Sequence, residues 1–201
     1  MNHISENNES DRRLVSLVLS GDKQAFGKIV KNTEGLVAQI VFKLVDHSED
    51  RRDIAQDIYL KVYSNLPGFR FHSKLSTWIA QIAYNTCISH LQKKKLALTG
   101  DPVAGDNDDS EYAAGGNPVQ SEPEVETMIL KKQQSAILST EIERLPSLFK
   151  TLITLFHNEQ LSYEEIAVIT GLPTGTLRSY LFRARKLLKT NLLQKYKKDD
   201  L

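Results

Sequence analysis

The sequence predicts an all-α protein: two small helical domains joined by a flexible acidic linker, with a helix-turn-helix in the second domain. Three observations support this fold class. Apolar residues recur at helical spacing over most of the 201 residues. Strands are not expected, because no run alternates apolar and polar residues and no Asn-Gly pair signals a hairpin. Between residues 96 and 123 the helical pattern stops, and the chain becomes rich in glycine, proline, serine and aspartate.

The first predicted domain spans residues 11–95, after a polar lead of ten residues that we expect to be disordered. Its helical patterns are separated by capping or breaking signals, and they run from Leu14, from Asp22 to Val45, from about Asp50 to Leu66, and from about Lys74 to Lys95. Aspartate and serine near the second and third starts are good capping residues, and a Pro-Gly pair opens a loop before the fourth. A compact helical domain is therefore expected.

The predicted linker spans residues 96–123. From residue 96 to residue 127 the chain carries eight acidic side chains and no basic one. A stretch with so little to bury cannot offset the entropy lost on ordering, so we expect it to be flexible. Its aspartates lack the ligand spacing of a calcium loop. Helices resume in the second domain, residues 124–196, first to Arg144, then from Ser147 to His157, and then as a final pair.

The final pair lies in the segment LSYEEIAVITGLPTGTLRSYLFRAR. Ser162 and Glu165 have the spacing of a capping box at a helix start. Gly171 suits the left-handed turn that ends a helix, and Pro173 with Thr174 suits the start of the next one. Two helices joined by so short a turn predict a helix-turn-helix.

The second helix of this pair has an apolar side and a basic side. At about 100° per residue, one face collects Leu177, Leu181, Ala184 and Leu188. From Pro173 to Lys198 there are eight lysines or arginines and no acidic residue. A solvated helix usually mixes charges, whereas a face of one sign fits a polyanion. The segment therefore predicts nucleic-acid binding, with an ordinary solvated face on a helical hairpin as the alternative.

Two features of the first domain also point to function. On the helix after DHSED, an exposed leucine with acidic and amide neighbours lies opposite the apolar stripe: Leu60 with Asp53, Gln56 and Asp57. An apolar centre with a polar rim is typical of a protein-docking patch. After the Pro-Gly pair, aromatic and basic residues alternate, a composition that suits unstacked single-stranded nucleic acid. Trp78, on the helix that follows, is more simply explained as a core residue.

Composition excludes several classes of function. A single cysteine, Cys87, excludes an internal disulfide framework and a cysteine-cluster zinc site, and its helical surroundings favour a core position. The five histidines are scattered and no glycine-rich phosphate loop precedes a helix, so we expect no metal, no cofactor and no enzymatic activity. The first ten residues do not resemble a signal peptide, and no apolar run approaches the roughly 20 residues of a membrane span. A cytoplasmic location is the expectation.

Taken in order, these segments resemble a bacterial RNA polymerase sigma factor of the extracytoplasmic-function group. DIAQDIYLKVYSNLPGF resembles the polymerase-binding segment of that family, and FRFHSKLSTWIAQIAYNTCISHL resembles its segment for the promoter −10 element. LPSLFKTLITLFHNEQLSYEEIAVITGLPTGTLRSYLFRARKLL resembles the C-terminal domain for the −35 element. The match covers about residues 11–95 and 125–195. It implies a protein that binds core RNA polymerase and directs promoter recognition, −10 melting and transcription initiation.

The resemblance also implies roles for particular residues. Those implied to dock on a coiled coil of the largest polymerase subunit are Asp53, Gln56, Asp57 and Leu60. Those implied to form a pocket for a −10 base flipped from the non-template strand are Phe69, Arg70, Phe71, His72, Lys74 and Asn85. Those implied to face the −35 major groove are Thr176, Arg178, Ser179, Phe182, Arg183 and Lys186, with Arg185 and Lys186 the better candidates for phosphates. An anti-sigma partner that covers both DNA-binding domains is also implied.

The main alternative is a stand-alone helix-turn-helix regulator that binds duplex DNA as a dimer. It explains the C-terminal domain equally well, but not the Leu60 patch or the aromatic loop. The two hypotheses differ in one requirement. A regulator should bind its operator alone, whereas a sigma factor should need core polymerase.

Overall fold

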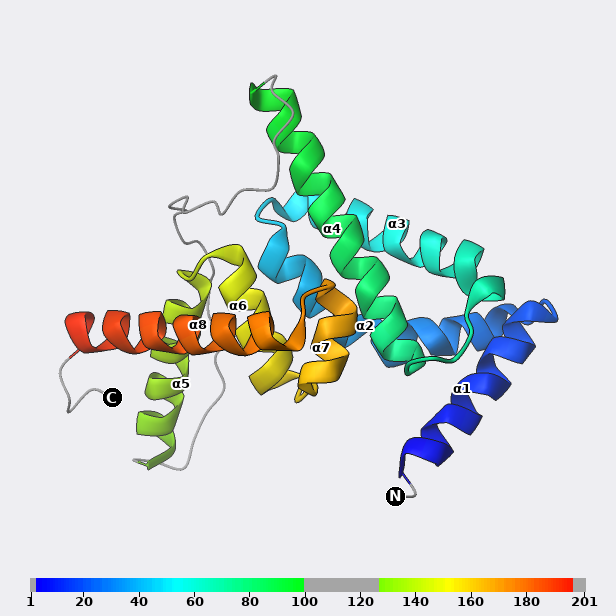
Figure 1. Ribbon diagram of the computed structural model, residues 1–201, viewed down its shortest axis with the longest axis horizontal. Coiled ribbons are helices and arrows are strands. Elements are labelled where there is room, and N and C mark those ends of the chain that lie inside the picture. The colour runs from blue at the N-terminus through cyan, green and yellow to red at the C-terminus, as the bar shows by residue number, and fades with distance from the viewer. Residues whose placement is uncertain (1–2, 100–126, 197–201) are drawn as a thin grey trace.

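The computed structural model describes residues 3–99 and 127–196, and all regular elements of these segments are helices (Figure 1). The N-terminal half contains α1 (His3–Leu19), α2 (Lys23–Leu44), α3 (Ser48–Asn65) and α4 (Leu75–Thr99), with a short 3-10 turn at Leu66–Gly68. The C-terminal half contains α5 (Thr127–Glu143), α6 (Ser147–Ile153), α7 (Tyr163–Thr170) and α8 (Thr174–Lys195), with a π-helical turn at Thr154–Asn158. Most of the predicted linker, residues 96–123, lies outside the described residues.

Two helix boundaries differ from the sequence prediction. α1 begins at His3, so the prediction of a disordered lead is wrong for residues 3–10. A polar composition does not oppose this extension, because each residue added to an existing helix gains one backbone hydrogen bond. α4 continues to Thr99, beyond the predicted helix end at Lys95.

Two of the predicted caps form side-chain hydrogen bonds, whereas the N-cap of α3 is His47, which makes none, so the cap predicted there is wrong. The Asp22 carboxylate accepts hydrogen bonds from the amides of Gln24, at 2.8 Å, and Ala25, at 3.2 Å, at the start of α2. At the start of α7 the Ser162 hydroxyl accepts from the Glu165 amide at 3.1 Å, and the Glu165 carboxylate accepts from the Ser162 amide at 2.9 Å. This reciprocal pair is the predicted capping box. The helix-turn-helix is therefore defined locally by its own residues.

The predicted apolar stripes form the core. On α3 the buried residues are Ile54, Ile58 and Val62, and on α8 they are Leu177, Leu181, Ala184 and Leu188. Cys87 on α4 is fully buried, and burial raises the pKa of its thiol to about 12. A thiol that stays protonated at neutral pH packs as a small apolar side chain, as predicted.

The two halves of the described chain pack against each other. α7 lies against α4, and α6 lies against α2 (Figure 1). Buried residues from both halves join in one apolar cluster. Ion pairs also cross the contact, among them Lys43 with Glu143, and Lys74 with Glu165 at 2.8 Å. The helix-turn-helix is thus held beside the loop that precedes α4.

Candidate nucleic-acid and protein interfaces

The first candidate surface is one face of α3. All four predicted docking residues are exposed there, namely Asp53, Gln56, Asp57 and Leu60. The Leu60 side chain is 67% exposed, whereas Ile58, two residues earlier, is fully buried. Asp57 pairs with Lys61 at 2.6 Å, within the same helix. Tyr63, one turn further along α3, is 51% exposed, so Leu60 and Tyr63 form a small apolar surface with a polar rim, which is the anatomy of a protein interface.

The second candidate surface is the loop from Leu66 to Lys74. Its side chains alternate between the protein interior and solvent: Phe69 is buried, Phe71 is half-buried, and Arg70 and His72 are exposed. The Phe69 ring centroid lies 4.9 Å from that of Trp78 and 4.6 Å from that of Phe71. Phe69 is only 8% exposed, so in this arrangement it anchors the loop instead of facing solvent. The exposed residues of the loop are Pro67, Gly68, Arg70, His72 and Lys74.

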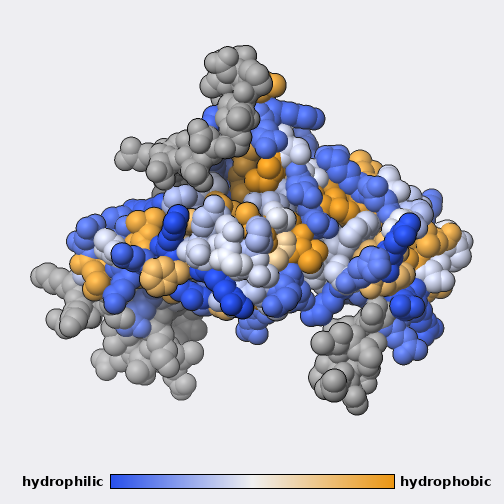
Figure 2. All heavy atoms as spheres, in the orientation of Figure 1, coloured by the Kyte–Doolittle hydropathy of each residue, from blue (hydrophilic) through white to orange (hydrophobic). Residues whose placement is uncertain are grey.

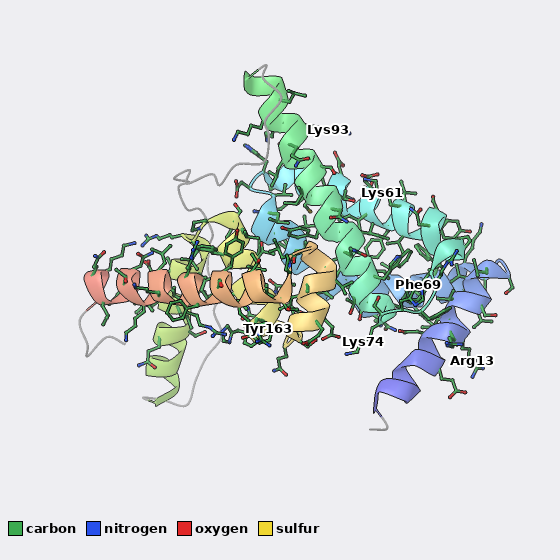
Figure 3. All side chains as sticks on the ribbon, in the orientation of Figure 1. Arg13, Lys61, Phe69, Lys74, Lys93 and Tyr163 are labelled. Carbon is green, nitrogen blue, oxygen red and sulfur yellow. The ribbon has the colours of Figure 1, made fainter. Side chains whose placement is uncertain are left out.

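Lys74 ends this loop and lies beside α7 in Figure 3. Its ammonium group contacts the Glu165 carboxylate at 2.8 Å. Burial opposes ionisation of Glu165, but hydrogen bonds from Lys74 and from the Ser162 amide hold its pKa below the ordinary value. A cation predicted to serve the −10 surface is therefore paired with the helix-turn-helix. Asn85, the remaining −10 candidate, is exposed on α4.

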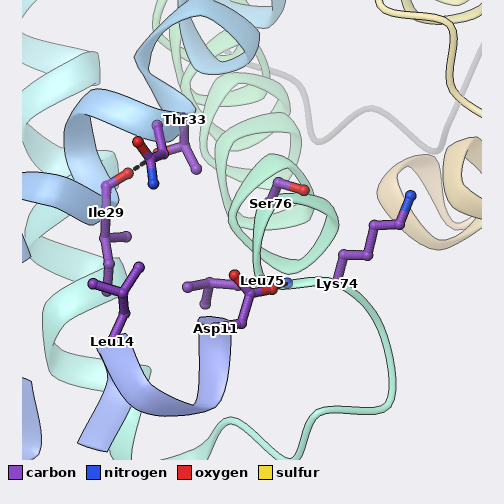
Figure 4. Close-up of a pocket in the computed structure, with 8 residues that line it drawn as sticks. Asp11, Leu14, Ile29, Thr33, Lys74, Leu75 and Ser76 are labelled. Carbon is purple, nitrogen blue, oxygen red and sulfur yellow. Dashed lines mark hydrogen bonds between the residues drawn. The ribbon is translucent and has the colours of Figure 1, made fainter. Parts of the chain in front are cut away.

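A small hollow of about 250 Å³ adjoins this loop, between α1, α2 and the start of α4 (Figure 4). The Asp11 carboxylate lies at its edge and accepts a hydrogen bond from the Leu75 amide at 3.1 Å. Lys74 also lines the hollow, but its side chain extends away toward the neighbouring helix. The sequence did not predict a role for Asp11, because no local pattern links it to a loop more than sixty residues away.

The third candidate surface is the outer face of α8. Five of its six predicted residues are exposed, namely Arg178, Ser179, Phe182, Arg183 and Lys186, while Thr176 is half-buried. Phe182 is 68% exposed, which is unusual for so large an apolar side chain. Arginines beside an exposed ring can bind guanine edges and thymine methyl groups in a major groove.

Aromatic residues from outside α8 support its arginines. The Arg178 guanidinium lies 5.4 Å from the Tyr163 ring centroid, and that of Arg185 lies 5.2 Å from Phe156. Arg185 also donates a hydrogen bond to His157 Nε2 at 3.3 Å. Burial and the nearby Arg185 charge lower the pKa of His157, so its imidazole is neutral and can accept this bond. Sequence reasoning missed these partners, because ring stacking across a turn leaves no periodic pattern.

The surface view does not show one broad apolar band. In Figure 2 the hydrophobic residues on this face form small groups separated by hydrophilic ones. Leu60 on α3 and Phe182 on α8 are exposed apolar side chains of two of the candidate surfaces.

Two family models match the chain in order along the sequence. Sigma-70 region 2 matches residues 29–96, and Sigma-70 region 4 matches residues 135–188. The ECF RNA polymerase sigma-E factor of Escherichia coli (strain K12) is 35% identical over 181 residues, which are 89% of this chain and 92% of the relative. The chain belongs to the extracytoplasmic-function group of RNA polymerase sigma factors. The match to region 2 contains α3 and most of α4, and the match to region 4 contains α7 and most of α8.

Two other relatives of this sigma factor support the same family assignment. The RNA polymerase sigma-H factor of Pseudomonas aeruginosa is 32% identical over 180 residues, 90% of this chain and 92% of the relative. The ECF sigma-E factor of Haemophilus influenzae is 32% identical over 183 residues, 91% of this chain and 95% of the relative. As a sigma factor, the protein binds core RNA polymerase and promoter DNA and directs transcription initiation.

Solved structures support the same fold. CnrH, in complex with the cytosolic domain of CnrY, superposes with a TM-score of 0.61 at 19% identity, covering 92% of this chain and 99% of that one. RpoE from Bartonella quintana, in complex with the anti-sigma factor NepR, gives 0.60 at 23% identity, covering 86% and 98%. Within residues 3–99 and 127–196, no helix of the sigma factor combines the length and apolar character of a membrane span.

Proposed function

We propose that this sigma factor docks on the largest subunit of core RNA polymerase through the α3 face of Asp53, Gln56, Asp57 and Leu60. Leu60 supplies the apolar centre, and burial of a leucine contributes about 1.5–3 kcal/mol. The three polar residues form the rim that sets orientation. The observation that supports this assignment is the contrast between exposed Leu60 and fully buried Ile58 on the same helix.

We further propose that the loop from Leu66 to Lys74, together with Asn85, receives a −10 base extruded from the non-template strand. Extrusion costs a few kcal/mol of lost stacking, which contacts in the pocket must offset. The exposed side chains suited to this role are Arg70, His72, Lys74 and Asn85. Phe69 would act from beneath, since its ring packs on Trp78 and supports the loop.

At the −35 element, the outer face of α8 enters the major groove. Arg178 and Arg183 suit guanine edges, and the exposed Phe182 ring suits a thymine methyl group. Lys186 and Arg185 contact phosphates, which fix position without specifying sequence. Arg185 is oriented for this by Phe156 and His157.

The sigma factor carries out no chemistry of its own in this proposal and acts in the cytoplasm, where core polymerase is found. Its fold is shared with an RpoE that was solved with the anti-sigma factor NepR. We infer that an anti-sigma partner also regulates this chain, by covering its two DNA-binding surfaces.

The test is in vitro transcription with purified core polymerase on a library of promoters randomised at the −10 and −35 elements. Addition of the sigma factor should enrich transcripts from promoters with defined bases at both elements. Without core polymerase, the protein should not protect the same promoters. A stand-alone regulator would do the opposite. It would bind duplex DNA without core polymerase and would not direct the polymerase to particular promoters. That result would overturn the proposal.

A further inference from the structure

Two consecutive residues of α1 hold the loop from Leu66 to Lys74 from outside. The Arg12 guanidinium lies 5.0 Å from the centroid of the Phe71 ring, near the middle of the loop. The Asp11 carboxylate accepts a hydrogen bond from the amide of Leu75, directly after the loop, at 3.1 Å (Figure 4). Both contacts join segments that are distant in sequence, so they constrain the loop in space.

Phe71 needs such support, because its backbone is unusual. Its φ of 58° lies in the left-handed region, which bulky side chains rarely adopt. A residue persists there only where its surroundings hold it. Here the Phe71 ring contacts Phe69, which is buried against Trp78, and the cation of Arg12. Arg12 is the one of these partners that comes from α1.

The contacts that hold Phe71 also fix the direction of the exposed side chains beside it. Along the loop, exposed Arg70, His72 and Lys74 alternate with the more buried Phe69, Phe71 and Ser73. Because neighbouring side chains share one backbone, fixing Phe71 fixes where Arg70 and His72 point. Binding sites need their groups within about 0.5 Å of the productive geometry. A shift of Phe71 would therefore misplace the groups that face the DNA.

Asp11 acts where the loop ends and α4 begins. Leu75 is the first residue of α4, and its amide has no acceptor within the helix. A carboxylate at a helix start satisfies that amide and interacts favourably with the helix dipole. α4 also carries Asn85. The contact therefore ties the loop end and the α4 start to α1.

We propose that Arg12, together with Asp11, is a positioning residue for −10 recognition. The pair holds the loop in the shape that receives the extruded base and does not itself contact the base. This inference rests on the proposed function, since it concerns the same loop. It adds α1 to the elements that determine promoter specificity.

The experiment uses holoenzyme made with the full chain and core polymerase. Transcription is measured on a promoter selected from the library and on copies with each −10 base changed singly. Arg12→Ala should lower the preference for the selected −10 base by about two- to fivefold, as expected for loss of an exposed cation–π contact. Arg12→Lys keeps a cation over the ring and should restore part of that preference. Arg13→Ala is the matched control, because Arg13 is exposed on the same helix and labelled in Figure 3.

A second variant removes the hydrogen bond between the Asp11 carboxylate and the Leu75 amide. Asp11→Ala should lower the same preference, while core binding and −35 binding stay unchanged. Salt dependence separates positioning from direct contact, because loss of a phosphate contact weakens all sequences alike and reduces the salt slope. Equal loss on every −10 sequence with a smaller salt slope would overturn the inference. So would a preference for Arg12→Ala equal to that of Arg13→Ala.

Failure of the proposed function gives a different pattern. If wild-type holoenzyme shows no preference at −10, the proposed function fails and this inference fails with it. If Arg70→Ala removes the preference while Arg12→Ala and Asp11→Ala do not, the −10 assignment stands. In that case only the role of α1 is wrong.

Discussion

Leu60 lies at the centre of the proposed polymerase contact. Its side chain is 67% exposed, its neighbours one turn back are Gln56 and Asp57, and Tyr63 one turn on is 51% exposed. Nothing in the described fold needs a leucine here, because the buried side of α3 is formed by Ile54, Ile58 and Val62. The free energy of its burial becomes available only when a partner covers it.

Leu60→Asp should therefore weaken binding to core polymerase by at least tenfold. The change removes about 1.5–3 kcal/mol of apolar burial and adds a charge at the centre of the contact. Affinity can be measured by fluorescence titration with labelled sigma factor, with the melting temperature as a fold check. Leu19→Asp is the control, since Leu19 is 53% exposed on α1. Equal affinities of the two variants would show that α3 is not the docking face.

Arg183 is the residue-scale test of the −35 surface. Arg183→Ala should cost about 1–3 kcal/mol of binding to the selected −35 duplex and relax the preference at one base pair. Lys189→Ala, an exposed cation further along α8, should leave that preference intact. Competition binding of holoenzyme to promoters with single −35 substitutions measures both effects. A uniform loss on all sequences for Arg183→Ala would assign it to a phosphate instead.

At the scale of elements, the helix-turn-helix depends on one backbone conformation. Gly171 ends α7 with a φ of 73°, a left-handed conformation that costs other residues free energy. The chain turns there and starts α8 at Thr174, which places the basic face of α8 outward. The turn therefore positions the proposed −35 surface.

Two glycine substitutions should change the free energy of unfolding in opposite directions. Gly171→Ala should destabilise the protein by about 1 kcal/mol, because alanine is strained at positive φ. Gly175→Ala should stabilise it by up to about 1 kcal/mol, because Gly175 is helical and alanine is the better helix former. Neither position has a neighbour within 4 Å of an added Cβ, so crowding does not distinguish them. Urea unfolding measures both, and a common sign would refute the argument.

At the scale of the whole molecule, ion pairs bridge the two halves. Lys43 pairs with Glu143, and the poorly exposed Lys150 lies 4.0 Å from Glu143 and 3.9 Å from Asp46. Lys74 pairs with Glu165 across the same contact. DNA bound at the proposed −10 surface would compete with Glu165 for Lys74. In that proposal, contact between the two halves and DNA binding require the same cation.

Glu143→Lys should increase the separation of the two halves, because it places a third cation beside Lys43 and Lys150. Each exposed pair contributes about 0–1 kcal/mol, so a partial shift in population is expected, and high salt should shift the wild type in the same direction. Distances between spin labels on α3 and α8 measure the shift. Glu34→Lys, an exposed change of the same charge on α2, is the control. Unchanged distances for Glu143→Lys would mean that the ion pairs of Glu143 do not hold the halves together.

The sequence alone determined the order of the helices, the caps of α2 and α7, and the apolar stripes of α3 and α8. Asp22, the Ser162–Glu165 box and Gly171 act as predicted, because each interacts with residues only two to four positions away. The same local periodicity separated Leu60 from Ile58 and the outer face of α8 from its buried face. Order along the chain was sufficient to place it in its family.

Only the tertiary structure decided which functional groups support one another. Phe69 is buried, Arg12 lies on Phe71, Tyr163 lies under Arg178, and Lys74 faces Glu165. These partners lie in different helices or across turns, so no sequence period relates them. Their meeting depends on how amphipathic helices pack around a shared core, and that packing is set by the fit of many side chains at once.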